Sequence, residues 1–238
     1  MELNKLLKEG KIPKKFPHPS NETFNEYRNR QINWWVNNVN GSELPKNRRN
    51  DYLQFFNRIK ENTNVDVLSI GENKKLGEVC GGAWGGIINM FFKNNMKYHI
   101  DILSDFFNYI NVVNDKHKTK WICNPAEHIL LEDNFFDVLF AYNSLDHGWD
   151  IDKALSESIR VAKKGFISFN VDNDLLLKNY PNRDHYQRVR KDKVLSQVYQ
   201  IPCIKKWWFK KLDTTKNGLI WGKNCRKCGL LLEIYFEK

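Results

Sequence analysis

Glycines and one acidic residue stand where two predicted strands end. Gly71 follows the apolar run VDVLSI (65–70), and five further glycines lie within 77–86. A ligand that approaches the main chain closely needs residues without a Cβ atom, and the helix that follows offers free N–H groups. Asp101 lies near the end of the run KYHIDI (97–102), where a carboxylate can accept hydrogen bonds from both hydroxyls of a ribose. These residues predict a site for a nucleoside-containing ligand.

Two later predicted strands, 121–123 and 137–143, also lead into polar residues. Because the carboxyl ends of parallel strands meet at one edge of a sheet, these residues are expected to line the same cleft. Those after the first strand would flank an adenine edge, and those after the second would form the floor of the cleft: Ala126 and Glu127, then Asn143 and Ser144.

Asp146 and His147 are expected at the mouth of this cleft. Histidine is the side chain most easily poised to take a proton near neutral pH, so His147 is the first candidate for a general base. Asp146 is the second candidate, or the residue that orients His147. The alternative is that both residues belong to a solvated loop that caps the next helix.

The elements that must position these residues alternate between strand and helix. A helix is expected over 151–164, where apolar residues recur on one face and Gly165 follows. The strands are expected at 65–70, 97–102, 121–123, 137–143 and 165–171. Such alternation is typical of an α/β fold with a doubly wound, mostly parallel sheet, here a seven-stranded sheet of the Rossmann-like type.

The flanking segments would complete this core. Residues 1–20 are expected to be irregular, and helices from Ser20 and over 51–62 would form a lid beside the sheet. Strands at 218–222 and 229–238 would add a C-terminal antiparallel pair. The predicted organisation is an N-terminal arm and helical lid at 1–62 and an α/β domain at 63–238. A substrate-facing insertion is expected at about 173–211.

The composition is that of a globular protein with a basic surface. The net charge is +10, and two pairs of lysines flank three aromatic residues in KKWWFKK (205–211). This charge indicates either a well-solvated surface or contact with nucleic acid. No apolar run is long enough for a membrane span, and no signal peptide is visible. The five scattered cysteines are typical of a reducing compartment, so a cytoplasmic location is expected.

Two segments together resemble the class I S-adenosylmethionine-dependent methyltransferases of the small-molecule, type 11-like subgroup. They are AEHILLEDNFFDVLFAYNSLDH (126–147) and LSESIRVAKKG (155–165), which follow the family patterns AExLPxxDxxFDxVxxxxxLxH and LxExxRVLKPGG. The resemblance covers roughly 65–171. It implies that the chain is an enzyme that binds S-adenosylmethionine, releases S-adenosylhomocysteine, and methylates an oxygen or nitrogen of a small molecule, such as a sugar or sugar nucleotide.

The resemblance also implies roles for individual residues. The methionine part of the cofactor would lie against Gly71 and the 81–86 cluster, which includes Gly82 and Gly85, and the ribose against Asp101 with Ile102 beside it. Glu127 and its neighbour Ala126 would border the adenine, with Asn143 and Ser144 beneath the sulfonium. The family carries an acid two residues before its first glycine, where this chain has Ser69, and Glu72 would supply the displaced acid.

The acceptor pocket is expected to draw on the N-terminal helices and on the predicted insertion. Four of its residues would grip an anionic substrate: Arg183, His185, Tyr186 and Arg188. Two alternatives stay open, namely methylation of RNA or another nucleic acid, and a non-catalytic interaction protein on a decayed methyltransferase fold. Cys225 and Cys228 form one half of a zinc site, but no partner pair has the usual spacing, so no metal is expected. The sequence predicts no oligomeric state.

Overall fold

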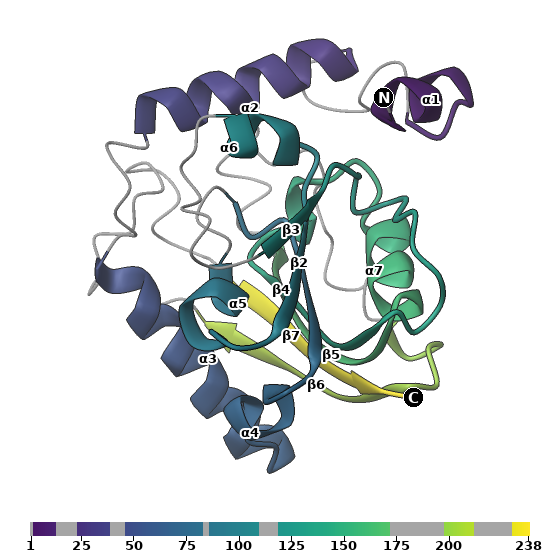
Figure 1. Cartoon of the computed structure of the whole chain (residues 1–238). Coiled ribbons are helices and arrows are strands. Elements are labelled where there is room, and N and C mark those ends of the chain that lie inside the picture. Colours follow the sequence, from purple (N-terminus) through teal and green to yellow (C-terminus); the bar gives the residue numbers. More distant parts are fainter. Residues whose placement is uncertain are drawn as a thin grey trace.

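The computed structural model describes residues 2–12, 23–38, 46–82, 86–109, 119–171, 198–211 and 230–238 (Figure 1). Its strands are β1 (Lys75–Val79), β2 (Met96–Ile100), β3 (Thr119–Ile122), β4 (Phe136–Tyr142), β5 (Ala162–Val171), β6 (Ile204–Lys211) and β7 (Leu230–Glu237). Its helices are α1 (Glu2–Lys8), α2 (Phe24–Asn38), α3 (Lys46–Thr63), α4 (Val67–Gly71), α5 (Gly86–Phe91), α6 (Ser104–Tyr109) and α7 (Ile151–Arg160), with a 3-10 turn, η2, at Leu145–His147.

The described strands form one seven-stranded sheet in the order β3-β2-β1-β4-β5-β7-β6. The first five strands are parallel, and β7 runs antiparallel to both of its neighbours, β5 and β6. The mostly parallel, doubly wound α/β fold and its C-terminal antiparallel pair are therefore confirmed. The order reverses between β1 and β4, which places the expected ligand cleft at their carboxyl ends.

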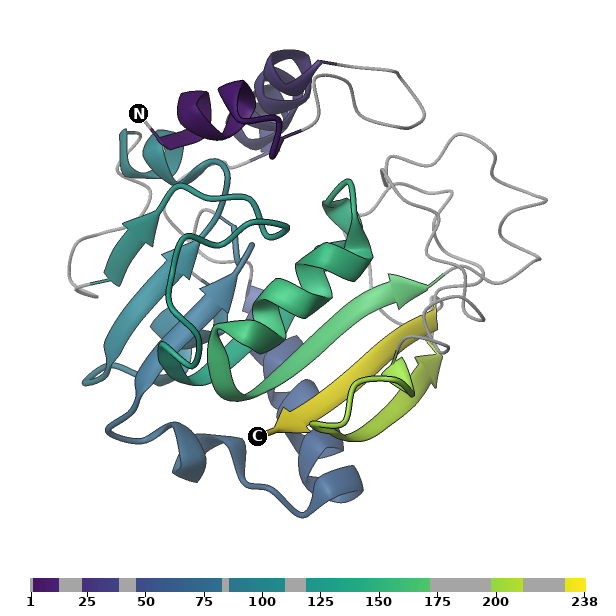
Figure 2. The same ribbon diagram turned by 90° about the vertical axis from the view of Figure 1, so that its right-hand side faces the viewer.

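Helices cover both faces of the sheet (Figure 2). One face packs under α7, with Leu139, Ile167 and Ile234 among its fully buried residues. The opposite face packs under α3 and α5 through Leu76 and Phe140. A third, smaller apolar cluster joins α1 and α2 to α6, so α1 and α2 lie at one end of the sheet rather than on its faces.

The predicted first strand is in fact a helix, α4. The carboxylate of Asp66 accepts hydrogen bonds from the N–H groups of Leu68 and Ser69 at 3.1 and 3.3 Å, which caps this short helix. The true first strand is LGEV with the preceding Lys75, ten residues farther along the chain. Gly77 lies at the centre of this strand. A glycine is needed there because a Cβ atom would lie 2.7 Å from the ring of Phe136. The β-branched run at 65–70 was therefore the wrong signal.

The partner of the last strand was also predicted at the wrong place. β7 confirms the strand expected at 229–238, but it pairs with β6, the KKWWFKK segment that was expected to face the substrate. The indole N–H of Trp208 donates to buried Glu233 at 2.6 Å, and Trp207 packs on the α7 face. The lysine pairs that flank the aromatic residues are thus accounted for by an edge strand, where lysines also discourage pairing with another chain.

Three smaller points concern the remaining predictions. Residues 2–8 form helix α1 rather than an irregular arm, while α2 and α3 confirm the two N-terminal helices. The strand expected at 218–222, the CxxC pair and most of the expected insertion lie outside the described residues. None of the helices described is both long and apolar enough to span a membrane.

Candidate active site

The loop after β1 is built around the buried carboxylate of Glu78. Its two oxygens accept hydrogen bonds from the N–H groups of Ile87 and Ile88, at the start of α5, at 2.9 and 3.0 Å. Burial raises the pKa of Glu78 to about 7, although these hydrogen bonds favour the charged form. The side chain therefore fixes where α5 begins relative to β1.

Between Glu78 and α5 the chain turns in left-handed backbone. Cys80 has φ +55° and Gly82 has φ +75°. With β1 at its true position, Glu78 is the acid two residues before the first glycine position of the compact family motif, and Cys80 takes that glycine's place. The predicted departure at Ser69, with Glu72 as the displaced acid, is therefore wrong, because it came from the misplaced strand.

Gly71 and Glu72 do not reach this loop. Gly71 ends α4, before β1 begins, so it lies at the amino edge of the sheet. A Cβ atom there would collide with the ring of Phe92, which accounts for the glycine by packing. Glu72 is exposed at the end of the same helix. Gly82 lies in the loop as expected, and Gly85 falls outside the described residues.

Asp101 directly follows β2 and faces the loop after β1. It is buried, its Oδ1 accepts a hydrogen bond from the N–H of Leu103 at 2.9 Å, and the backbone of Gly82 also donates to it. Burial raises the pKa of Asp101 to about 6 against the effect of these hydrogen bonds. The structure thus brings together the acid and the glycine that the sequence assigned to one site, with Ile102 buried beside them.

Ala126 and Glu127 follow β3, and both are buried. Ala126 packs in the core under α7. Oε1 of Glu127 accepts hydrogen bonds from the N–H groups of Trp149 at 2.6 Å and Asp150 at 3.3 Å. Burial raises its pKa to about 7. Glu127 therefore ties the loop after β3 to the loop after β4, a positioning role that the sequence did not predict.

The loop after β4 begins at the floor of the cleft. The hydroxyl of Ser144 donates to the carbonyl of Val79 at 3.2 Å, so it links the carboxyl ends of β4 and β1. Asn143 has φ +53°. The amide of Asn170 on β5 donates to Oδ1 of Asn143 at 2.6 Å and to Oδ2 of buried Asp146 at 3.1 Å. Asn143, Ser144 and Asp146 are thus held in one group at the crevice.

His147 ends the 3-10 turn that follows, and its side chain is partly exposed. The hydroxyl of Tyr27 on α2 donates to the carbonyl of His147 at 3.4 Å. Burial, with Cys80, Glu127 and Asp101 nearby, raises the pKa of Tyr27 well above its usual value. Helix α2 thus contacts the loop after β4 at the carboxyl edge of the sheet.

A second residue of α2 reaches the loop after β1. A Cβ atom on Gly82 would lie 2.8 Å from the indole of Trp35, and Trp35 packs edge-on against Phe107 of α6 with ring centroids 5.4 Å apart. Arg28 pairs with Asp105 of α6 at 2.5 Å. Helix α2 is therefore in direct contact with Gly82, one of the residues that the sequence predicts to bind the cofactor.

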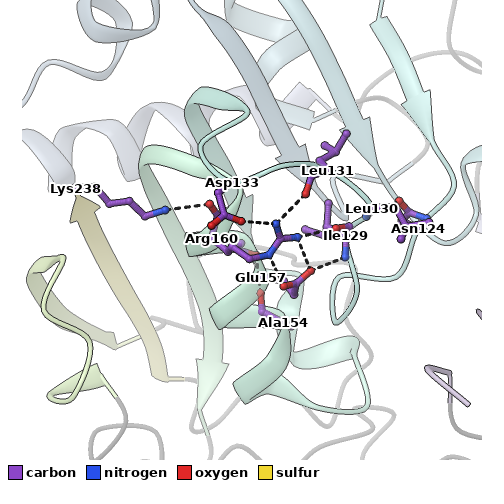
Figure 3. A network of polar contacts seen from close by, with 10 residues as sticks. Asn124, Ile129, Leu130, Leu131, Asp133, Ala154, Glu157, Arg160 and Lys238 are labelled. Carbon is purple, nitrogen blue, oxygen red and sulfur yellow. Dashed lines mark hydrogen bonds and ion pairs between the residues drawn. The ribbon is translucent and has the colours of Figure 1, made fainter.

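The second family motif has a structural explanation (Figure 3). Arg160 bonds Glu157 with two nitrogens, at 2.7 and 2.9 Å, and donates to the carbonyls of Ile129 and Leu131 at 2.8 Å each. Glu157 in turn accepts the N–H of Ile129 at 2.8 Å. The acid and arginine of LSESIR thereby clamp the segment after β3, which carries Ala126 and Glu127, onto α7.

Residues 80–169 match the protein family described as "Methyltransferase domain". This stretch, from the loop after β1 into β5, is similar to a methyltransferase domain. The family's methyl donor is S-adenosylmethionine, so this protein is an S-adenosylmethionine-dependent enzyme. A comparison with curated protein sequences found no match.

Solved methyltransferase structures share the fold. A protein from Galdieria sulphuraria, provisionally named a sarcosine dimethylglycine methyltransferase, aligns with a TM-score of 0.59 at 11% identity, over 90% of this chain and 98% of that one. An S-adenosylmethionine-dependent methyltransferase from Thermotoga maritima aligns with a TM-score of 0.53 at 13% identity, also over 90% and 98%. The [4+2]-cyclase SpnF aligns with a TM-score of 0.52 at 14% identity, over 77% of this chain and 80% of that one, so the fold alone does not determine the reaction.

Sequence reasoning missed Glu78, Tyr27 and Trp35. The position of Glu78, two residues before the run Cys-Gly-Gly, could have revealed its role. No comparable signal marks the two aromatic residues. The four residues predicted to grip the acceptor, Arg183, His185, Tyr186 and Arg188, lie outside the described residues. Among those described, no group of three or more His, Cys, Asp and Glu side chains could hold a metal ion.

Proposed function

We propose that this enzyme transfers the methyl group of S-adenosylmethionine to an oxygen or nitrogen of a small molecule. The observation that carries the proposal is the meeting of Gly82 and Asp101 at the carboxyl edge of β1 and β2, next to the crevice floored by Ser144. Glycine main chain, a buried carboxylate and the hydroxyl of Ser144 would suit the methionine part, the ribose and the sulfonium of the donor, in that order.

The cofactor supplies an activated methyl group when it is bound. The chain's own contribution is mainly position, because holding two reactants in line removes much of the entropic barrier. In the proposal Asp101 holds the ribose, and Asn143 and Ser144 lie beneath the reacting centre. Helix α2, through Tyr27 and Trp35, keeps water from the cleft.

A proton must leave the acceptor when the acceptor is a hydroxyl or an ammonium group. We assign its removal to His147, which lies in the loop after β4 and has a partly exposed side chain. Asp146 is buried and bonded to Asn170, which suits it to fix the loop that carries His147. Replacing His147 by Ala should lower turnover by about 10²–10⁴-fold if it is the base. An H147A protein as fast as the wild type would leave His147 without a catalytic role.

The direct test is calorimetric titration with S-adenosylhomocysteine, followed by an assay of labelled methyl transfer to a panel of small molecules, with sugars and sugar nucleotides included. Asp101→Ala should weaken nucleoside binding by about 1.5–3 kcal/mol, the range for a hydrogen bond to a charged group. Glu132→Gln, an exposed acid that precedes β4, is the matched control and should bind as the wild type does. Unchanged affinity in D101A would contradict the ribose assignment. Transfer to RNA rather than to small molecules, with binding that weakens steeply as salt rises, would favour the nucleic-acid alternative.

A further inference from the structure

Arg48 lies in the first turn of α3, at the carboxyl edge of the sheet. Its guanidinium carbon lies 5.4 Å from the ring centroid of Tyr52 and 5.8 Å from that of Tyr142, the last residue of β4. Its Nε donates to the hydroxyl of Tyr52 at 3.3 Å. Two aromatic rings and one hydrogen bond therefore hold the side chain in place and leave its two terminal nitrogens as the remaining donors.

Other arginines of the described residues show what such donors usually bind. Arg58 forks onto Glu233, Arg160 onto Glu157, and Arg28 pairs with Asp105. Arg48 makes no ion pair with any carboxylate in the described part of the chain, and no hydrogen bond from its terminal nitrogens is found there. It is nonetheless only partly exposed, so water alone solvates it less well than it would a surface arginine.

The charge of Arg48 is supported by its surroundings. Burial lowers the pKa of its guanidinium, but Tyr52, Tyr142 and Asp51 raise it by more, so the side chain stays protonated. A planar, charged fork with free donors matches the two oxygens of a carboxylate, which it binds with two parallel hydrogen bonds. The geometry favours an anion of that shape over a neutral group.

This fork is close to the proposed methyl-donor site. Tyr142 immediately precedes Asn143 and Ser144, which floor the cleft. Arg48 is also near enough to Glu78 to lower the pKa of that carboxyl, yet both oxygens of Glu78 are already bonded to the start of α5. Arg48 therefore lies near Glu78 of β1 and the end of β4, and it forms no ion pair with a carboxylate of the described residues.

We propose that Arg48, steadied by Tyr52 and Tyr142, binds the carboxylate of a ligand in this cleft. The carboxylate belongs either to the amino-acid end of the methyl donor or to the acceptor. The inference rests on the proposed function and deepens it, since it assigns a residue and a chemical group to one end of the reactants.

The test compares two nucleosides that differ in this group. S-adenosylhomocysteine carries an amino-acid carboxylate, whereas 5′-methylthioadenosine keeps the adenosine and the sulfur without it. Calorimetry would measure both ligands on the wild type, Arg48→Gln and Arg49→Gln. Arg49 is the matched control, because it is an exposed arginine on the same turn that stacks on Phe91 at 4.7 Å instead.

If the carboxylate is that of the donor, R48Q should bind S-adenosylhomocysteine about tenfold or more weakly, as expected for a lost charged hydrogen bond. Its affinity for 5′-methylthioadenosine should not change, and R49Q should match the wild type for both. If the carboxylate is that of the acceptor, both nucleosides should bind R48Q normally. Acetate, added at constant ionic strength to the nucleoside-bound protein, should then raise the melting temperature of the wild type and not of R48Q.

Three results would overturn the proposal. One is equal nucleoside affinity in R48Q and the wild type together with an equal response to acetate. Another is an equal loss of both nucleosides in R48Q, which would assign Arg48 a structural role. The third is R49Q behaving as R48Q does. A wild-type protein that binds neither nucleoside would instead contradict the proposed function itself, so the two failures are distinguishable.

Discussion

The loops after β1 and β4 lie side by side at the carboxyl edge, and each is positioned by a buried glutamate. Glu78 precedes its loop on the same strand and bonds the start of α5 with both oxygens. Glu127 comes from a different loop, the one after β3, and bonds two N–H groups of the β4 loop with a single oxygen. Burial raises the pKa of both carboxyls to about 7.

The loops differ in what they present to the cleft. The β1 loop has left-handed backbone and small residues at 80–82, so main chain would face a ligand bound as proposed. The β4 loop presents the polar side chains of Asn143, Ser144 and Asp146, two of them fixed by Asn170 of β5. In the proposed function, the β1 loop would hold the methyl donor by its backbone, and the β4 loop would contact the reacting groups by its side chains.

The largest expected effect comes from adding a methyl group at Gly86. Its Cβ atom would collide with Oε1 of Glu78 in a backbone with φ +50°. We expect Gly86→Ala to lower the free energy of unfolding by about 2–5 kcal/mol. Of this, roughly 1–2 kcal/mol comes from a non-glycine residue in left-handed backbone and roughly 1–3 kcal/mol from a broken buried hydrogen bond. A Cβ atom in Gly148→Ala would likewise collide with Oε1 of Glu127. Because Gly148 has φ −76°, this variant should lose only the contribution of the hydrogen bond. Urea unfolding of both variants measures the difference, and equal losses would contradict the role of backbone strain.

The two glutamates themselves should respond unequally to an amide. In Glu78→Gln one side-chain oxygen is replaced by an NH2 group that faces an N–H of α5, so we expect a loss of about 2–3 kcal/mol. In Glu127→Gln the remaining oxygen can still accept from both Trp149 and Asp150, so the loss should stay below about 1 kcal/mol. Thermal unfolding distinguishes them, and a larger loss in E127Q would reverse the comparison.

The pH dependence of ligand binding should identify the donor side. The pKa of Asp101 is about 6 in the folded protein, above its ordinary value of 3.8. Only the ionised form can accept hydrogen bonds from both ribose hydroxyls with its two oxygens. Affinity for S-adenosylhomocysteine should therefore fall by up to roughly tenfold per unit below about pH 6.

Asp101 should affect the stability of the ligand-free protein in the opposite sense, so that stability rises where affinity falls as the pH is lowered. A raised folded-state pKa means that the folded chain binds the proton more tightly than the unfolded chain, so the Asp101 contribution to stability rises as the pH falls from 6 toward 4. Asp101→Asn should flatten both profiles over this range. A D101N protein with the wild-type binding profile would assign the dependence to another group.

The smallest expected effect concerns Cys80, which has φ +55° without being glycine. Cys80→Gly should exceed Cys80→Ala in stability by about 1 kcal/mol, because only the glycine removes the left-handed strain. At Asn143, Gly should gain little over the natural residue, since asparagine tolerates this region. Chemical denaturation of the three variants and the wild type provides the measurement. Equal stability of C80G and C80A would show that the turn does not hold the strain.

Much of the fold could be predicted from local pattern. The strands that became β2, β4 and β5, the helix α7 and the acid Asp101 all have signals within a few residues of themselves. The first strand was missed because its centre holds Gly77 and Glu78, which are poor strand residues in isolation. Gly77 is explained only by the ring of Phe136 above it, and Glu78 only by the N–H groups of α5.

The sequence by itself determined the α/β class, the family motifs and the acid beside the expected ribose site, because these depend on periodicity and on short spacing. Tertiary structure alone decided that KKWWFKK is an edge strand, that Glu127 holds a neighbouring loop, and that Arg48 lies at the end of β4. Each of these depends on a contact between segments far apart in the chain. Such a contact leaves no local pattern, because the sequence around each partner does not depend on the segment that it contacts.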